Sequence, residues 1–145
     1  MKVTLKYDKR LARDEIGLTA REKNMAVNRI ADFAIKEVFR LVAQKDGEQV
    51  LVELADVQQI YATNKKVYCF ANKQEYLLKE RLYQLLERLP NSFVQISRSE
   101  IIQLRYVERF IFTRNGIIEI IFKDGQKTSV SRRYFQKIKG ALYHA

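Results

Sequence analysis

The chain has 145 residues, one cysteine and a formal net charge of +10, and 47% of its residues are hydrophobic. This is the composition of a globular protein. The lone Cys69 excludes an internal disulfide and favours the reducing cytoplasm. The sequence contains neither a signal peptide nor a run of about 18 apolar residues that could span a membrane. The positive charge is concentrated in residues 1–45 and 98–145, so DNA, RNA and an anionic membrane surface are candidate partners, although such a charge also fits a role in solubility alone.

The first 45 residues predict a strand followed by a long amphipathic helix. Residues 2–7 alternate polar and apolar side chains, as on a short strand with one buried face. From Thr19 to about Gln44, apolar residues recur every three or four positions, and Thr19 followed by Glu22 matches a capping box. We therefore expect residues 1–45 to form an N-terminal unit whose helix packs on the rest of the chain or on a second copy.

Residues 46–145 predict a second domain that is mainly β with flanking helices. The hydrophobic period changes to two from Gln49 onward, and Asn115-Gly116 is the strongest hairpin signal in the chain. The absence of alternating strands and helices argues against a nucleotide-binding sheet. Strands are expected at 49–54, 57–63, 66–71, 75–78, 93–97, 100–104, 107–114, 117–122 and 127–131, and helices at 79–89 and 132–142.

Residues that could perform catalysis or bind a metal are too few to predict an enzyme. His144 is the only histidine and lies next to the C-terminal residue, where we expect a frayed tail. Cys69 falls in an apolar strand, where a buried and inert thiol is expected. A zinc site needs several such ligands, and no glycine-rich phosphate loop is present. We expect no enzymatic activity, no cofactor and no metal.

Three polar breaks in the β-rich half carry cations beside small hydrogen-bonding side chains. Arginine and lysine bind phosphate oxygens, arginine can also read a guanine edge in the major groove, and serine and asparagine suit phosphate contacts. Each break on its own also fits a solvated turn, but three of them in a basic domain favour nucleic acid. No pattern resembles a helix-turn-helix pair, so we expect contacts from loops. The breaks are Asn64-Lys65-Lys66, Ser97-Arg98-Ser99 and Ser131-Arg132-Arg133.

Residues from about Gln49 to Leu142 resemble the LytTR domain of bacterial response regulators. The segment FVQISRSEIIQL, residues 93–104, is similar to the family signature F-x-R-[IV]-[HS]-[RKN]-S-x-[IVL]-[VI]-N-[LI]. The segment DGQKTSVSRRYFQKIK, residues 124–139, is similar to the closing pattern D-G-x-x-x-x-V-S-R-[RK]-x-x-x-x-[LI]-[KR]. Leu51 to Phe70 matches the opening strands of the family more loosely. The three segments occur in the expected order.

The resemblance implies a DNA-binding domain built as an elongated arrangement of short β-sheets, which inserts loops into successive major grooves. Arg98 stands where the family places a base- or phosphate-contacting side chain, and Arg133 where it has an arginine that reads a base. Ser97 replaces the histidine of many members and Gln103 the usual asparagine, so the operator sequence can differ from theirs. The DNA-binding residues expected on these grounds are Asn64, Lys65, Lys66, Arg98, Ser99, Gln103, Ser131, Arg132 and Arg133.

The resemblance also implies partners. Such domains bind imperfect direct repeats with two protomers side by side, so double-stranded DNA and a homodimer on DNA are expected. Residues 1–45 are too short for a receiver domain, which indicates a stand-alone cytoplasmic regulator. Some relatives of this layout are held inactive by a small membrane protein, which implies an inhibitor of that kind. The alternative is a non-catalytic RNA-binding or protein-interaction module, which would tolerate substitutions in the three loops.

Overall fold

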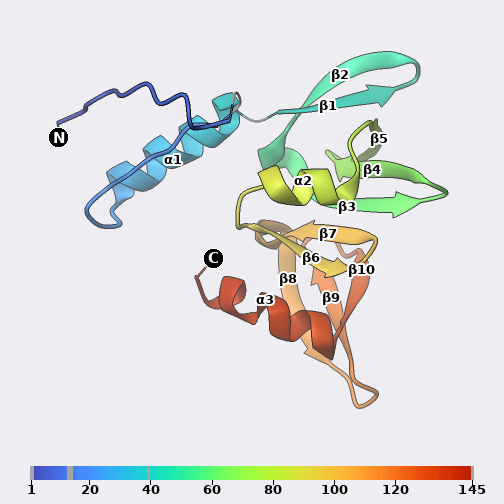
Figure 1. Cartoon of the computed structure of the whole chain (residues 1–145). Coiled ribbons are helices and arrows are strands. Elements are labelled where there is room, and N and C mark those ends of the chain that lie inside the picture. Colours follow the sequence, from blue (N-terminus) through green and yellow to red (C-terminus); the bar gives the residue numbers. More distant parts are fainter. Residues whose placement is uncertain (1, 13–14, 39, 145) are drawn as a thin grey trace. The chain divides into compact units, whose positions relative to one another are not determined.

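The structure is a computed structural model that describes residues 2–12, 15–38 and 40–144 (Figure 1). The chain divides into two compact units, the first ending at Arg40 and the second beginning at Leu41. The second unit contains two antiparallel sheets and most of the core, and the mainly β fold class expected from the sequence is confirmed.

The N-terminal unit contains one helix, α1 (Met25–Val38), preceded by a segment without regular structure. The helix begins after Asn24, whose side-chain oxygen accepts a hydrogen bond of 2.9 Å from the N–H of Val27. An asparagine here satisfies one of the free N–H groups of the first turn, so it fixes where the helix starts. The predicted start at Thr19 is therefore wrong. The strand predicted at residues 2–7 is also wrong, since these residues pair with no strand in the described part of the chain.

Residues 40–45, predicted as the end of the long helix, form a strand instead, β1 (Arg40–Lys45). Leu41 and Ala43 are each 1% exposed whereas Val42 is 44% exposed, which is the alternation of a strand with one buried face. Apolar residues in this stretch fit both a helical period and a period of two. Backbone pairing of Ala43 with Leu78 decides in favour of the strand, and this partner lies too far along the chain for local periodicity to indicate it.

Seven strands form the larger sheet of the C-terminal unit, in the order β2-β1-β5-β4-β3-β7-β6. The strand predictions from residue 49 onward are confirmed here to within one or two residues. Helix α2 (Leu82–Arg88) covers part of one face and buries Leu82 and Leu85. The remaining strands are β2 (Glu48–Glu53), β3 (Val57–Thr63), β4 (Lys66–Ala71), β5 (Gln74–Leu78), β6 (Phe93–Ser97) and β7 (Glu100–Gln103).

Two-residue turns with positive φ at both positions connect three consecutive strands of this sheet. Asn64 (φ 50°) and Lys65 (φ 64°) join β3 to β4, and Asn72 (φ 52°) and Lys73 (φ 61°) join β4 to β5. Such turns match the right-handed twist of the flanking strands, and asparagine tolerates the left-handed region better than most residues. The two turns have nearly the same backbone but lie at opposite ends of β4.

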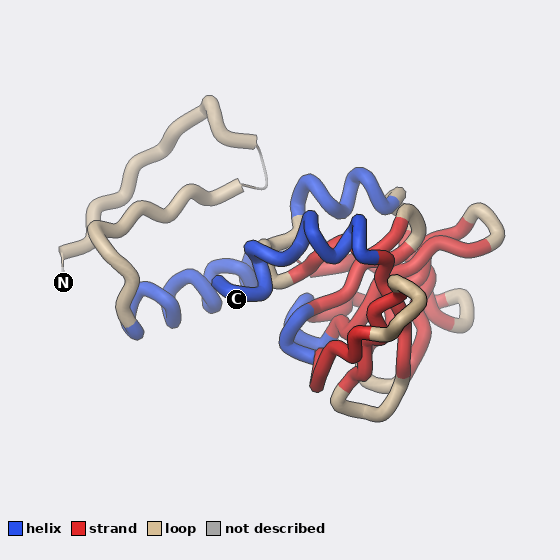
Figure 2. The backbone as a smooth tube through the Cα atoms, turned by 90° about the horizontal axis from the view of Figure 1, so that it is seen from below, coloured by secondary structure: helices blue, strands red, loops and turns tan. Residues whose placement is uncertain are grey.

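A second core lies between the larger sheet and a three-stranded sheet of order β10-β9-β8. In Figure 2 the helices of this unit lie outside the strands, and α3 packs near β6 and β10. The elements are β8 (Val107–Phe112), β9 (Ile117–Phe122), β10 (Lys127–Ser131) and α3 (Arg132–His144). The buried side chains of this core come from both sheets and the helix: Val94, Ile96, Ile102, Ile118, Ile120, Phe122, Val130 and Ile138. It therefore holds the ends of β6, β7 and β10 in fixed positions.

Candidate nucleic-acid interface

The first predicted loop is the tight turn between β3 and β4. Because its backbone bends back within two residues, the side chains of Asn64, Lys65 and Lys66 are all exposed at the tip of the hairpin. Neither lysine forms an ion pair with a described acidic side chain. The loop therefore presents two cations, without a described acidic partner, at the tip of a paired hairpin.

The second predicted loop is the turn between β6 and β7, in which Ser97 pairs with Glu100 across the hairpin. The backbone N–H of Ser99 donates a hydrogen bond of 3.2 Å to Oγ of Ser97, which closes the turn. Arg98 at the tip is exposed and has no acidic partner among the described residues.

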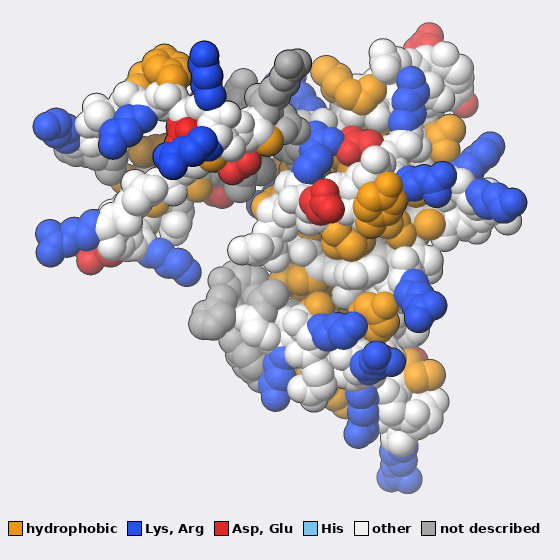
Figure 3. Space-filling model, in the orientation of Figure 1, with side chains coloured by type: hydrophobic (Ala, Val, Ile, Leu, Met, Phe, Trp, Pro, Cys, Tyr) orange, Lys and Arg blue, Asp and Glu red, His pale blue; other side chains and the backbone are white. Residues whose placement is uncertain are grey.

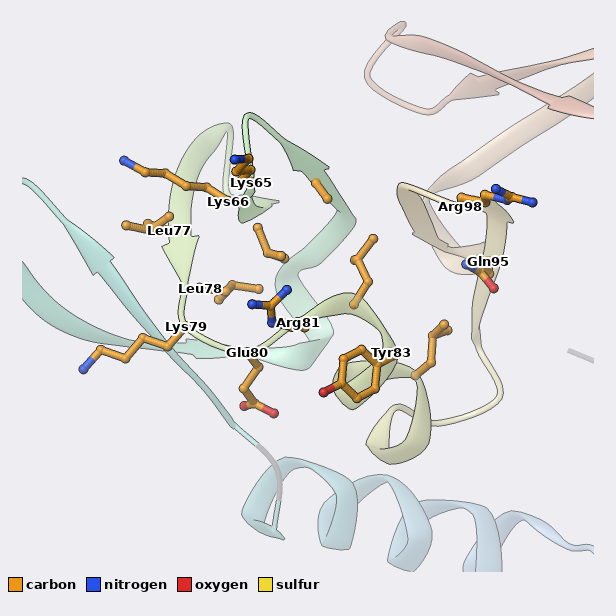
Figure 4. Close-up of a pocket in the computed structure, with 14 residues that line it drawn as sticks. Lys65, Lys66, Leu77, Leu78, Lys79, Glu80, Arg81, Tyr83, Gln95 and Arg98 are labelled. Carbon is orange, nitrogen blue, oxygen red and sulfur yellow. The ribbon is translucent and has the colours of Figure 1, made fainter.

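Backbone contacts place the first two loops at the same end of neighbouring strands. Tyr61 of β3 pairs with Glu100 of β7, and the N–H of Ala62 donates a hydrogen bond of 2.8 Å to the carbonyl oxygen of Ser99. Lys65 and Arg98 also line the same groove, with a volume of about 550 Å³. Figure 4 shows them on opposite sides of this groove.

The third predicted loop is the junction of β10 and α3. Oγ of Ser131 accepts a hydrogen bond of 3.2 Å from the N–H of Tyr134, so Ser131 acts as the N-cap of the helix. Arg132 and Arg133 occupy the first turn and are exposed. No acidic residue lies in that turn. The N-terminus of a helix carries a partial positive charge, so two cations there are unfavourable. A phosphate bound at this end would offset this repulsion.

A half-buried carboxylate ties the second loop to the strand that leads into the third. The hydroxyl of Thr128 in β10 donates to both carboxylate oxygens of Glu100, at 2.8 and 3.0 Å. Burial raises the pKa of Glu100, and the hydrogen bond from Thr128 lowers it by less. In Figure 3 lysine and arginine side chains follow one side of the unit, from the β3–β4 turn past the β6–β7 turn to the start of α3 and the β8–β9 turn.

Gln103 does not belong to this surface, and its prediction as a DNA contact needs correction. The side chain is 4% exposed, and its Nε2 donates to the carbonyl oxygens of Leu54 at 3.0 Å and Val57 at 2.6 Å. Both N–H groups of the amide are thus used inside the protein. Gln103 fixes the short 3-10 turn before β3 and is not available to a base edge.

Two cationic positions beside the loops were missed by the sequence patterns. Arg114 is exposed in the β8–β9 turn. This turn lies beside the third loop, since a side chain added at Gly116 would come within 3.9 Å of Nε of Arg132. Arg81 lies at the start of α2, a helix whose summed charge is nearly neutral, and lines the groove with Lys65 and Arg98. The Asn115-Gly116 signal could have directed attention to Arg114, but nothing local indicates the position of Arg81.

Cys69 and His144 are the residues that the sequence offered as candidates for catalysis. Burial raises the pKa of the Cys69 thiol to about 12, which suppresses the reactive thiolate. The side chain of His144 lies outside the described residues. In the part of the chain that is described, no group of three or more His, Cys, Asp or Glu residues is placed to hold a metal ion, and no helix is long and apolar enough to span a membrane.

The arrangement of short sheets and exposed cationic turns matches a known family. A family model described as the LytTr DNA-binding domain matches residues 47–143. The chain belongs to the LytTR family. This is a family of DNA-binding domains, and the membership confirms the resemblance seen in the sequence motifs.

Relatives and a solved structure agree with this membership. The chain is 38% identical over 102 residues to an uncharacterized HTH-type transcriptional regulator of Staphylococcus aureus strain NCTC 8325, covering 70% of this chain and 69% of the relative. It is 37% identical over the same length to a protein of the same description from strain MRSA252. A LytTr DNA-binding domain from Bacillus cereus superposes with a TM-score of 0.67 at 20% identity, over 71% of this chain and 95% of that domain. This last likeness shows the fold.

The buried position of Gln103 gives a first prediction. Replacing Gln103 with Met keeps the shape but removes one hydrogen-bond donor from each of two carbonyl oxygens, although that of Leu54 keeps the N–H of Val57. The free energy of unfolding should therefore fall by about 1–3 kcal/mol. Urea denaturation measures this, and Gln126→Met at an exposed site is the matched control. The folded variant should keep the DNA affinity of the LytTR domain. A loss of DNA affinity at unchanged stability would instead return Gln103 to the interface.

Proposed function

We propose that this LytTR protein is a sequence-specific DNA-binding regulator of transcription, and that its three loops enter successive major grooves. The observation that carries the proposal is the placement of the loops on one side of the C-terminal unit, tied by the Ala62–Ser99 and Thr128–Glu100 hydrogen bonds. The description of the staphylococcal relatives as transcriptional regulators supports the biological role. Their "HTH-type" label has no counterpart here, because five strands separate α2 from α3.

The loops are expected to make different kinds of contact with DNA. Lys65 and Lys66 are compact point charges at the tip of a hairpin, which suits contacts to phosphate oxygens. Arg133 is held at the start of a helix, and its planar guanidinium can form two hydrogen bonds to a guanine edge. Arg98, between them, is placed to bind either a phosphate or a base. Specificity for the operator would therefore come chiefly from the arginines.

The operator is proposed to consist of imperfect direct repeats occupied by two protomers. The helix of the N-terminal unit is a candidate dimer contact, since Ile30 is 45% exposed and Phe33, one turn further, is 66% exposed. A second copy of α1 would bury both side chains. The small membrane-protein inhibitor implied by the family resemblance stays a prediction.

Arg133 should decide base recognition. Once genomic fragments bound by the protein have been selected and their shared site defined, Arg133→Ala should weaken binding to that site by about 1–3 kcal/mol and relax the preference at one base position. Fluorescence anisotropy with single-base variants of the site measures both effects. Lys139→Ala, an exposed cation further along α3, is the control. An equal loss on every sequence would make Arg133 a phosphate contact.

Lys65 and Lys66 should contribute without regard to sequence. Either Lys65→Ala or Lys66→Ala should weaken binding to specific and random DNA alike and reduce the slope of log K against log salt by about one. Lys73→Ala is a closely matched control, because Lys73 has the same place in the same kind of turn at the other end of β4. If the salt slope is unchanged in the first two variants, the β3–β4 turn is not in the interface. Full tolerance of all loop variants, with RNA or protein bound instead, would support the alternative module.

The dimer contact can be tested without DNA. Sedimentation should give a dimer for the full chain and a monomer for Ile30→Glu/Phe33→Glu, because charged groups cannot be buried in the proposed contact. Asn28→Glu, which adds a charge elsewhere on the exposed surface of α1, should remain dimeric. A full-length protein that is already monomeric at micromolar concentration contradicts this role for α1.

A further inference from the structure

We propose that the groove beside the first two loops binds an amphipathic anion, a carboxylate with a medium-length apolar tail, and that its occupant weakens DNA binding. The groove has a volume of about 550 Å³, within the range of about 300–1,000 Å³ that small-molecule sites occupy. The coupling to DNA rests on the proposed function, whereas the site itself does not.

The floor of the groove is apolar and is built by three elements of the sheet and by α2. Leu77 and Leu86 are only half-buried, and Tyr83 is 62% exposed, so apolar surface faces the groove and is left in contact with water. The full apolar lining is Ala62, Val67, Leu77, Leu78, Leu82, Tyr83 and Leu86. Covering this surface is favourable for a hydrocarbon tail, at about 25 cal/mol for each Å² removed from water. A DNA phosphate backbone gains nothing from a leucine floor.

The polar lining of the groove is strongly cationic. Five cations line it, namely Lys65, Lys66, Lys79, Arg81 and Arg98, and none is in an ion pair with a described residue. The acidic side chain in the lining, Glu80, is paired with Arg88 at 2.5 Å. The groove therefore selects an anion over a cation or a neutral molecule.

Arg81 is the residue placed to hold the head group. Figure 4 shows its guanidinium in the middle of the groove beside Leu78, while Lys65, Lys66 and Arg98 extend from the rim. A guanidinium can bind both oxygens of a carboxylate at once. A tail that runs from this point over Leu82 toward Leu86 and Tyr83 would cover the apolar floor, which explains why the ligand needs both a charge and a hydrocarbon part.

Lys65, Lys66 and Arg98 at the rim also belong to the proposed DNA interface. Binding of the anion should therefore weaken binding of DNA. An anion held by Arg81 adds negative charge beside Lys65, Lys66 and Arg98, and this lowers the affinity of that surface for phosphate. Linkage requires that DNA reduce the affinity for the anion by the same factor. The groove would then act as an effector site that releases the protein from DNA.

Decanoate below its micelle-forming concentration is the probe for the site. Calorimetric titration of the full chain without DNA should give saturable binding to one site, with amide shifts in α2 and β5. Acetate, which lacks the tail, and decyltrimethylammonium, which has the opposite charge, should not bind. Arg81→Ala and Tyr83→Ala, both at exposed positions, should each raise the decanoate Kd, the first by about tenfold. Lys73→Ala is the control and should bind as the wild type does.

Two results would overturn the site: no saturable decanoate binding, or binding that acetate shares or that survives both groove variants. The coupling is measured separately, as the DNA Kd with and without saturating decanoate. We expect an increase of about fivefold or more in the wild type and a smaller one at the same decanoate concentration in Tyr83→Ala, whose DNA affinity without decanoate should be unchanged. Saturable decanoate binding with no change in DNA affinity contradicts the coupling. Absence of specific DNA binding before decanoate is added contradicts the proposed function alone.

Discussion

The candidate interface depends on the pairing of β3 with β7. These strands are far apart in the sequence, and their antiparallel alignment brings the end of one to the beginning of the other, with Tyr61 opposite Glu100. The turn that follows β3 and the turn that precedes β7 must then lie together. A shift of this pairing by one residue would move all the core-facing side chains of the strand to the other face of the sheet. The buried residues of both strands therefore also fix the position of the loops.

Glu100 links this pairing to the third loop. Its backbone pairs with β3, while its carboxylate accepts hydrogen bonds from Thr128 of β10, three residues before the cap of α3. Partial burial raises the pKa of the carboxyl group, because removal from water disfavours its charged form. The hydrogen bonds from Thr128 offset part of this effect. A single residue thus relates the positions of all three cationic loops.

Much of the C-terminal unit could be predicted from the sequence because its information is local. Strands such as FVQIS and IIEIIF carry alternation or long apolar runs, and polar turns such as Asn64-Lys65 and Asn115-Gly116 separate neighbouring strands. The three cation-bearing loops follow directly from those breaks. The N-terminal part was predicted less well, because the apolar residues of 40–45 fit two periods and only pairing with β5 selects between them. Gln103 was misplaced because a motif position does not reveal whether a side chain is buried.

The groove could not be predicted from local sequence patterns, because its lining residues come from separate parts of the chain. Its lining comes from β3, β4, β5, α2 and β6, and Arg81 stands in a segment whose charges nearly cancel in the sequence. What makes Arg81 available is the pairing of its neighbour Glu80 with Arg88, at 2.5 Å. Charge counted along the chain therefore indicated the partner class but not the shape of the surface. The structure adds a cationic groove with an apolar floor next to loops that the sequence had already indicated.

The most direct test of the central claim is to map where the first and third loops lie on DNA. An iron chelate that cleaves DNA can be attached to Thr63→Cys or to Ser129→Cys, which are exposed positions beside the loops. Native Cys69 is buried, and burial raises the pKa of its thiol to about 12, which suppresses its reactive thiolate. If the first and third loops lie in adjacent major grooves, the two variants should cleave the selected site at positions about 10 base pairs apart. Cleavage at one common position, or cleavage spread evenly along the DNA, would contradict the account.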